Sequence, residues 1–178
     1  MLIISVKDVS VQSRHVHAHS LLKSCLRLHG IAYETDCGLV RNKYGKPSLE
    51  TDCGVHFSLT HAEGIAACVT SPFECGIDAE PVKKYRPNVV RRAFSRGEQE
   101  QLEALDSEDE RILLFTRLWT LKEAYVKALG IGISYPLAEA EFDLSDGSIR
   151  TPIQDFTFRN YLVCGERFSV SVCYSNKK

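Results

Sequence analysis

The sequence has almost no net charge, no cysteine pair of the C-x-x-C type and no long apolar run, and each absence excludes a class of protein. Lys and Arg total 22 against 23 Asp and Glu, which argues against a nucleic-acid binder that relies on a basic surface. No stretch approaches the roughly 20 apolar residues of a membrane span. The apolar run within residues 1–8 is too short for a signal peptide. We therefore expect neither a nucleic acid nor a membrane as partner.

The cysteines are odd in number, and no two of them have the spacing of a zinc or redox pair. They are Cys25, Cys37, Cys53, Cys68, Cys75, Cys164 and Cys173. We interpret them as buried free thiols. Unpaired thiols in a chain without an expected leader predict a reducing compartment, the cytoplasm.

Size and composition predict a folded chain of modest complexity. The 178 residues suffice for one domain or for two small lobes that share a core. Hydrophobic residues make up 44% and charged residues 25%, which excludes disordered, collagen-like and coiled-coil classes.

The two halves of the chain have similar patterns of predicted elements. The first half predicts a strand at 1–8, a helix at 13–28, short strands and a loop within 31–50, strands at 55–59 and 64–70 joined by 60–63, and a strand that ends at Pro81. The second half predicts a helix at 110–129 that ends at Gly130, and strands at 142–144, 156–158, 161–164 and 168–174. We therefore expect an α+β fold of two similar αβ lobes, residues 1–85 and 86–178, packed as one functional unit.

Charge is segregated between two neighbouring segments. Residues 81–96 contain six basic and no acidic side chains, whereas residues 98–110 contain seven acidic and no basic ones. The pattern is compatible with two solvated helical faces. It is also compatible with a basic docking surface for an acidic partner.

Two carboxylates lie close together near the end of a predicted strand. Asp78 and Glu80 are two residues apart in an extended segment, so their side chains leave the same face. Such a pair repels unless a cation joins it, and hard oxygen ligands suit Mg²⁺. The alternative is an edge strand with an outward acidic face.

Three further patterns carry candidate functional groups. Trp119, Glu123 and Lys127 form one stripe of the predicted long helix, which indicates either a surface ion pair or a third carboxylate beside a cation–phosphate site. Lys46 lies in a Gly-Lys-Pro turn suited to holding an ammonium group against a phosphate. His61 lies in the predicted connection between two strands, where a histidine is usually structural or solvated.

Five sequence blocks follow one another in a distinctive order: Y-G-K-P at 44–47, F-S-L-T-H at 57–61, G-I-D-A-E at 76–80, R-A-F-S-R-G-E at 92–98 and L-W-T-L-K-E-A-Y-V-K-A-L-G at 118–130. In this order they resemble the 4'-phosphopantetheinyl transferases of the Sfp type, from about Leu21 to Phe142.

The resemblance implies an enzyme that transfers 4'-phosphopantetheine from coenzyme A to a serine of an apo acyl or peptidyl carrier protein, releasing 3',5'-ADP. It implies a pseudo-twofold pair of lobes with coenzyme A between them. The family also contains a small trimeric synthase with its G-I-D motif near the N-terminus. Here Asp78 follows a complete first lobe, so we expect a monomer with an internal pseudo-dimer.

The resemblance also implies roles for individual residues. Asp78, Glu80 and Glu123 correspond to Mg²⁺ ligands, and Lys127 to a contact of the pyrophosphate. Glu123, or a water held beside it, is the expected general base, so Glu123 and Lys127 form the expected catalytic set.

The coenzyme A contacts implied by the blocks are Lys46, Pro47, Thr60, His61, Lys122 and Lys127. Lys46 and His61 correspond to contacts of the 3'-phosphate, and Lys122 to a structural residue or a contact of the pyrophosphate. Thr60 replaces the serine that often precedes the histidine. His19 stands near the position of a nucleotide-binding arginine, so Arg14, His19 and Arg41 are candidates for the nucleotide contact.

Two other functions remain open. An Mg²⁺-dependent nuclease or phosphodiesterase also uses two carboxylates and a lysine, but its E-x-K pattern is absent because Pro81 and Val82 follow Glu80. An inactive carrier-protein binding module is the second, although all three carboxylates are present.

Overall fold

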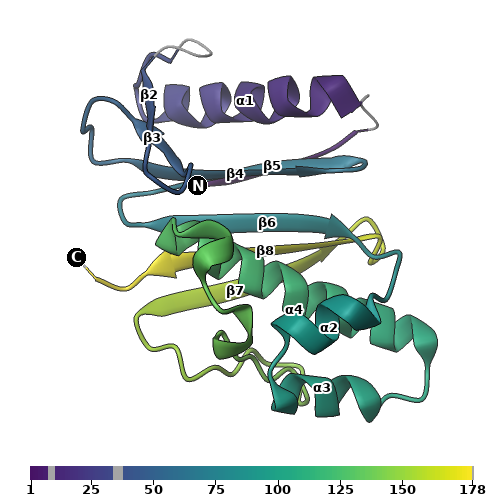
Figure 1. Cartoon of the computed structure of the whole chain (residues 1–178). Coiled ribbons are helices and arrows are strands. Elements are labelled where there is room, and N and C mark those ends of the chain that lie inside the picture. The colour runs from purple at the N-terminus through teal and green to yellow at the C-terminus, as the bar shows by residue number, and fades with distance from the viewer. Residues whose placement is uncertain (8–10, 34–37, 178) are drawn as a thin grey trace.

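The structure, a computed structural model, describes residues 1–7, 11–33 and 38–177. The first part of the chain forms a three-stranded antiparallel sheet of order β1-β5-β4 (Figure 1). Its elements are β1 (Leu2–Val6), α1 (Val11–Leu28), the short hairpin β2 (Leu39–Arg41) and β3 (Pro47–Leu49), β4 (His56–Ala62) and β5 (Ile65–Ser71).

The second part repeats this topology, with strand order β6-β8-β7. Its elements are β6 (Cys75–Pro81), α2 (Pro87–Ala93), α3 (Arg96–Glu103), α4 (Glu108–Leu129), the 3-10 turns η1 (Gly132–Ser134) and η2 (Leu137–Glu139), β7 (Phe156–Val163) and β8 (Phe168–Ser175). In both parts the first strand, a helix and two further strands follow in sequence, and the last strand lies in the middle of the sheet. The mixed α+β class is therefore confirmed, and the pseudo-twofold axis stays a prediction.

The two sheets pack face to face between the two long helices (Figure 1). Alternate residues of β5 serve both sides of the first sheet: Ile65 and Val69 contribute to the core between the sheets, and Cys68 to the core under α1. Ala124 of α4 packs on the outer side of the second sheet, against Cys173. The order of layers is therefore helix, sheet, sheet, helix.

Helix α4 has clear start and stop signals. The Ser107 side chain accepts a hydrogen bond from the Glu110 backbone N–H, and three acidic residues occupy the first turn. Gly130 ends the helix with φ 68°, as the sequence predicts.

On the neighbouring strand, β6, a Cβ atom at Gly76 would lie 1.9 Å from the Ala124 carbonyl oxygen. Only glycine lets β6 approach α4 so closely.

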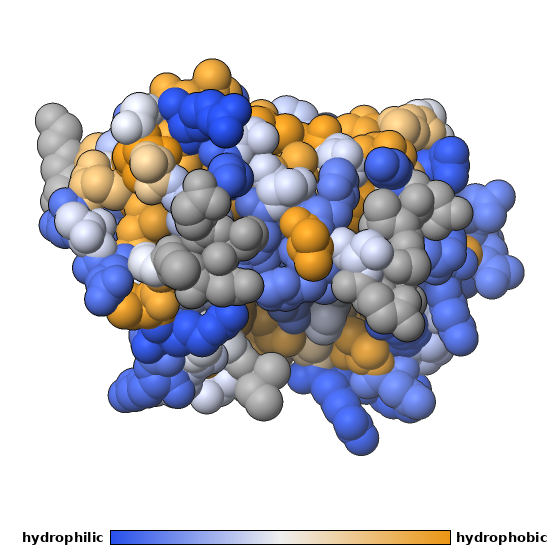
Figure 2. Space-filling view, turned by 90° about the horizontal axis from the view of Figure 1, so that it is seen from above, coloured by the Kyte–Doolittle hydropathy of each residue, from blue (hydrophilic) through white to orange (hydrophobic). Residues whose placement is uncertain are grey.

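Helix α1 buries one face. Ala18, Leu22, Cys25 and Leu26 are almost fully buried and recur at helical spacing. Figure 2 views the molecule from the outer side of α1, where hydrophobic and hydrophilic residues are intermixed on the surface. Among the residues described, none of the helices combines the length and the apolar character needed to cross a bilayer.

Several predicted strands need correction. β4 continues through Ala62, because Thr60 and His61 pair with Ala67 and Ala66 of β5, so both residues lie in a strand rather than in a connection. Residues 142–144 form no strand and contribute one isolated bridge, from Asp143 to Arg150. The two short strands predicted at 156–158 and 161–164 are one strand, β7, because β8 pairs along its whole length.

Two further expectations change in detail. Four of the cysteines are buried, but Cys53 and Cys164 are exposed, and Cys37 lies outside the described residues. Strand β6, which the predicted division after residue 85 assigns to the first lobe, is hydrogen-bonded to β8 of the second sheet.

Candidate active site

A cavity of about 360 Å³ opens where β4, β6 and α4 meet. It contains all the residues expected as metal ligands or catalytic groups, and its full lining is Leu59, Thr60, His61, Asp78, Glu80, Trp119, Glu123 and Lys127. Asp78 and Glu80 project from one face of β6, and Glu123 and Lys127 from one stripe of α4. The close approach at Gly76 brings this strand and this helix together.

Asp78 is the most constrained group of the cavity. It is 4% exposed, and its Oδ1 accepts hydrogen bonds from Lys127 Nζ at 2.6 Å and Thr60 Oγ1 at 3.1 Å. The other oxygen, Oδ2, is buried and has no hydrogen-bond partner. A buried carboxylate oxygen without a partner is costly, so the site is suited to a cation or a donor from a ligand.

The carboxylates of Glu80 and Glu123 are also partly buried and lie near Asp78. Burial, and next the charge of Asp78, raise the pKa of Glu80 to about 7. Burial and Asp78 also raise the pKa of Glu123, against the effect of Lys127. Mutual repulsion of this kind is relieved by a divalent cation. Within the described residues, no group of three His, Cys, Asp or Glu side chains forms a ready-made metal centre.

A second cavity, of about 240 Å³, adjoins the first. It is bounded by the loop before β3, by β4, and by the end of α4 with the residues that follow. The lining residues are Tyr44, Gly45, Lys46, Pro47, Phe57, Ser58, Leu59, Val126, Lys127, Gly130 and Gly132. Leu59 and Lys127 line both cavities. An elongated ligand in both cavities would therefore pass Lys127.

Lys46 and His61 do not line the same cavity, in contrast to their shared expected ligand. The Lys46 ammonium group is paired with Glu74 and donates a hydrogen bond to the Ala128 carbonyl oxygen at 2.7 Å. Pro47 lies beside it in the wall of the second cavity.

His61 lies in a basic environment. Burial, followed by the charges of His15, Lys127 and Arg14, lowers its pKa. The ring of His15 lies 6.3 Å from that of His61. The Arg14 Nε is buried without a hydrogen-bond partner. These groups favour an anion near His61.

His15 is a residue that the sequence analysis missed. Its ring also lies 4.3 Å from that of His19, one helical turn away on α1, and this i, i+4 spacing was the available signal. His19 itself is buried and hydrogen-bonded to the Tyr33 hydroxyl at 3.0 Å. Arg41 is exposed and donates to the Gly45 carbonyl oxygen. Neither His19 nor Arg41 lines the two cavities.

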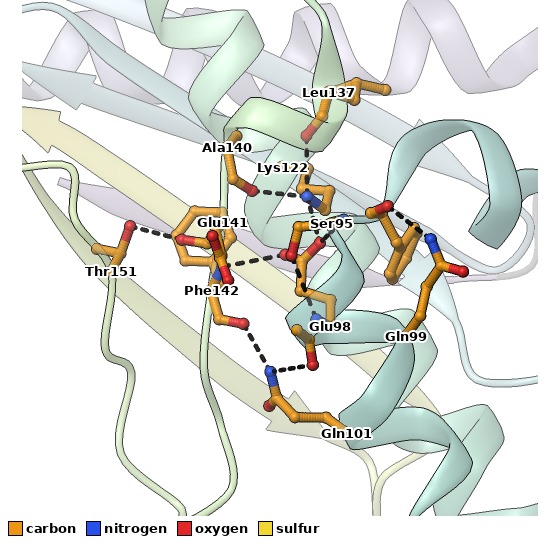
Figure 3. A network of polar contacts seen from close by, with 12 residues as sticks. Ser95, Glu98, Gln99, Gln101, Lys122, Leu137, Ala140, Glu141, Phe142 and Thr151 are labelled. Atoms are coloured by element: carbon orange, nitrogen blue, oxygen red, sulfur yellow. Dashed lines mark hydrogen bonds and ion pairs between the residues drawn. The ribbon is translucent and has the colours of Figure 1, made fainter.

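Lys122 lines neither cavity. It lies instead in a polar network with Glu98, Leu137 and Ala140 (Figure 3). It is completely buried and forms an ion pair with Glu98 at 2.7 Å. Its ammonium group also donates to the carbonyl oxygens of Leu137 at 2.9 Å and Ala140 at 2.6 Å. Of the two roles expected for Lys122, this placement favours the structural one over a pyrophosphate contact.

Glu98 joins three elements around Lys122. One carboxylate oxygen accepts the Ser95 backbone N–H in a capping box at the start of α3, and the other accepts the Phe142 N–H. The Ser95-x-x-Glu98 spacing was the sequence signal for this cap.

The layered α+β fold, the crowded carboxylates and the lysine between two cavities define a candidate ligand-binding enzyme site. The sequence model of the 4'-phosphopantetheinyl transferase superfamily matches residues 74–173, more than half of the chain. The chain therefore belongs to this superfamily, and the resemblance seen in its sequence blocks is confirmed.

Curated relatives agree with this assignment. The chain is 31% identical over 123 residues to the 4'-phosphopantetheinyl transferase Sfp of Bacillus subtilis. This match covers 68% of this chain and 54% of Sfp. It is 31% identical over 97 residues to the transferase gsp of Aneurinibacillus migulanus, covering 54% of this chain and 40% of gsp. Over 120 residues it is 31% identical to the human L-aminoadipate-semialdehyde dehydrogenase-phosphopantetheinyl transferase, covering 60% of this chain and 39% of the relative. The chain thus spans about half the length of these relatives or less.

A solved structure shares the fold. The holo-(acyl-carrier-protein) synthase of Bacillus anthracis, solved in complex with coenzyme A (3',5'-ADP), superposes with a TM-score of 0.50. The match has 17% identity and covers 60% of this chain and 97% of the synthase.

Proposed function

We propose that this chain transfers 4'-phosphopantetheine from coenzyme A to a serine of an apo acyl or peptidyl carrier protein, giving the holo-carrier and 3',5'-ADP. The unpartnered, buried Oδ2 of Asp78 carries this proposal. It lies in a cavity with Glu80, Glu123 and Lys127, in a chain of this superfamily. The names of the curated relatives, and the coenzyme A bound to the Bacillus anthracis synthase, support the same reaction.

The two cavities suit different parts of coenzyme A. The second cavity, with Phe57, Leu59 and Val126 in its walls, is suited to the nucleotide base. Lys127 would contact the pyrophosphate, and its position in the lining of both cavities supports this role. His61 would contact the 3'-phosphate, and the nearby Arg14 and His15 support this role.

The donor set of the first cavity suits Mg²⁺, because hard carboxylate oxygens are its preferred protein ligands. Asp78, Glu80 and Glu123 would hold the ion, and the unpartnered Asp78 Oδ2 gives it a free oxygen. When bound, Mg²⁺ would neutralise charge on the pyrophosphate.

Glu123 is the proposed general base. The carrier serine hydroxyl attacks the β-phosphorus of coenzyme A, and its proton passes to the Glu123 carboxylate. The new bond joins the serine oxygen to phosphorus. The bond to the bridging oxygen breaks, and 3',5'-ADP leaves with the electron pair. Lys127 holds the pyrophosphate in line for this displacement.

The partner is proposed to be acidic, as the exposed arginines of α2 suggest. The charge of Arg86, just before α2, partly offsets the rise in the pKa of Glu80, so α2 begins near the first cavity. The monomeric state and the cytoplasmic location are part of the same proposal, and the free thiols of the described cysteines suit a reducing compartment.

Mass spectrometry of apo-carrier proteins tests the proposal. The protein is incubated with coenzyme A, Mg²⁺ and a panel of fatty-acid, polyketide and peptide carrier domains, with the serine-to-alanine form of each carrier as control. We expect addition of phosphopantetheine to the serine, and its loss in excess chelator. Unmodified carriers across the panel, together with wild-type protein that binds no coenzyme A, would refute the proposal. Cleavage of coenzyme A without carrier modification would instead indicate the phosphodiesterase.

A further inference from the structure

Asn42, in the loop between β2 and β3, has an unusually complete set of hydrogen bonds. Its side-chain Oδ1 accepts the backbone N–H groups of Tyr44 at 2.9 Å and Lys46 at 3.0 Å. Its backbone N–H donates to the Lys46 carbonyl oxygen, and its own carbonyl oxygen accepts the Gly45 N–H. Asn42 thereby makes most of the hydrogen bonds that close the Tyr44–Pro47 loop, and the Arg41 side chain adds one to the Gly45 carbonyl oxygen.

The same amide also reaches α4, a helix that packs on the other sheet. Asn42 Nδ2 donates to the Gly130 carbonyl oxygen at 2.7 Å, across 88 residues of sequence. Both halves of the amide are therefore used, the oxygen within the loop and the nitrogen on the helix end. The last carbonyl groups of a helix have no intrahelical partner and lie at its negative end, so an N–H donor is favoured there.

Lys46 makes a second contact of the same kind. Its ammonium group donates to the Ala128 carbonyl oxygen at 2.7 Å and is held by Glu74. Its methylene chain lies over Gly130, where a Cβ atom would be 2.6 Å from Lys46 Cδ and 3.1 Å from Asn42 Nδ2. The loop therefore rests directly on the end of α4, and any side chain at position 130 would push it away.

This junction forms the second cavity. Tyr44, Gly45 and Pro47 of the loop line this cavity together with Lys127 and Gly130 at the end of α4. Asn42 itself does not line the cavity. The hydrogen bond from Asn42 to Gly130, together with that from Lys46 to Ala128, joins the loop to the end of α4 and so limits how far these two parts of the wall can separate.

We propose that Asn42 is a positioning residue that sets the width of the coenzyme A pocket by tying the β2–β3 loop to the end of α4. The inference rests on the proposed function, because that function assigns coenzyme A to this cavity. It adds a residue outside the five sequence blocks.

Asn42→Asp is the discriminating variant. It has nearly the same shape, and its carboxylate still accepts the two loop N–H groups, so the loop keeps its turn. The inter-element hydrogen bond is lost, because a carboxylate cannot donate to the Gly130 carbonyl oxygen and is repelled by the negative helix end. Asn176→Asp is the matched control: Asn176 is exposed, and its amide also donates to a distant carbonyl, that of Gln154 at 3.0 Å.

The measurements are the coenzyme A dissociation constant by titration calorimetry, the KM for the carrier, kcat and Tm. We expect Asn42→Asp to weaken coenzyme A binding about tenfold. The Gly130 carbonyl oxygen loses its hydrogen-bond donor, so the loop is no longer held against α4 at the width that coenzyme A needs. The carrier KM, kcat and Tm should match those of Asn176→Asp. Gly130→Ala should weaken coenzyme A binding in the same way, by displacing Lys46 and Asn42.

Wild-type coenzyme A affinity in Asn42→Asp would overturn the inference and leave the proposed function intact. A loss of coenzyme A affinity that is accompanied by a tenfold higher carrier KM and a clearly lower Tm would also overturn it, because a general structural role predicts that pattern. Wild-type protein that binds no coenzyme A would overturn the proposed function and the inference with it.

Discussion

Helix α4 carries two lysines, five residues apart, that are both paired with carboxylates from other elements. The Lys122–Glu98 pair is completely buried, and each of its polar atoms has a partner (Figure 3). The Lys127–Asp78 pair is partly open, with the lysine side chain 32% exposed and one Asp78 oxygen unpartnered. A lysine–carboxylate pair is therefore fully satisfied on one face of α4, whereas the pair on another face keeps a carboxylate oxygen that can still bind a ligand.

The difference separates stability from chemistry. A buried pair with every hydrogen bond made offers nothing to a ligand, and breaking it leaves an uncompensated charge. A pair with a free oxygen and a half-exposed ammonium group accepts a ligand without such a loss. The first pair should therefore affect folding, and the second should affect activity.

The largest expected effect is on the stability of the closed pair. Lys122→Met should lower the free energy of unfolding by about 3–5 kcal/mol, because it leaves the Glu98 carboxylate buried without its cation. Urea unfolding measures the change. Adding Glu98→Gln should restore much of the loss, since the amide carries no charge. If Lys122→Met costs no more than Lys177→Met, which removes an exposed pair with Asp155, the contrast between the pairs is wrong.

The open pair should show the reverse behaviour. Asp78→Asn should lower kcat/KM for holo-carrier formation about 100-fold, roughly 2.7 kcal/mol of transition-state stabilisation, because the site loses a ligand charge. The Tm should change by only a few degrees, since Asn keeps the shape and the hydrogen bond from Thr60. Asp146→Asn, on an exposed turn, is the control. A loss of stability as large as that of Lys122→Met would mean that both pairs are structural.

The basic surroundings of the open pair lead to a third, smaller effect. His61→Ala should reduce the preference for coenzyme A over its 3'-dephospho form about tenfold, because charged hydrogen bonds to a phosphate are lost. Lys46→Ala should reduce it less, since Glu74 and Ala128 already engage that ammonium group. Inhibition and KM values for both substrates measure the preference. His29→Ala, a histidine bonded to Thr70, is the control. An unchanged preference in His61→Ala would remove His61 from the 3'-phosphate site.

The smallest expected effect lies outside both pairs, on α2. Arg91→Glu with Arg92→Glu should raise the carrier KM about threefold to tenfold at low salt and leave the KM for coenzyme A unchanged, because opposite charges steer encounter. The effect should fade near 1 M salt, where the screening length is only about 3 Å. Lys7→Glu with Arg27→Glu makes the same charge change elsewhere. Equal carrier kinetics for the two double variants would indicate a solvated face on α2.

Predictions from the sequence were correct where the feature depends on a single helix or strand and not on contacts between elements. The helix that ends at Gly130, the strand that ends at Pro81 and the shared face of Asp78 and Glu80 are all present in the structure. Thr60 and His61 were misplaced, because the extent of β4 depends on its pairing with β5 and not on local signals. Asn42 carried no motif, since its importance arises from a contact 88 residues away.

By itself, the sequence determined the family and the local geometry that periodicity imposes: two carboxylates on one strand face, and Trp119, Glu123 and Lys127 on one helix stripe. It left Lys122 between a structural role and a contact of the pyrophosphate, because Lys122 and Lys127 have the same ionisation chemistry and stand in the same block. Only the tertiary structure decided that Lys122 faces Glu98 and the residues around Ala140, while Lys127 faces Asp78 and the cavities. The physical reason is that burial and charge pairing depend on elements distant in sequence, and a helix with apolar residues on several sides does not reveal which side each neighbour will cover.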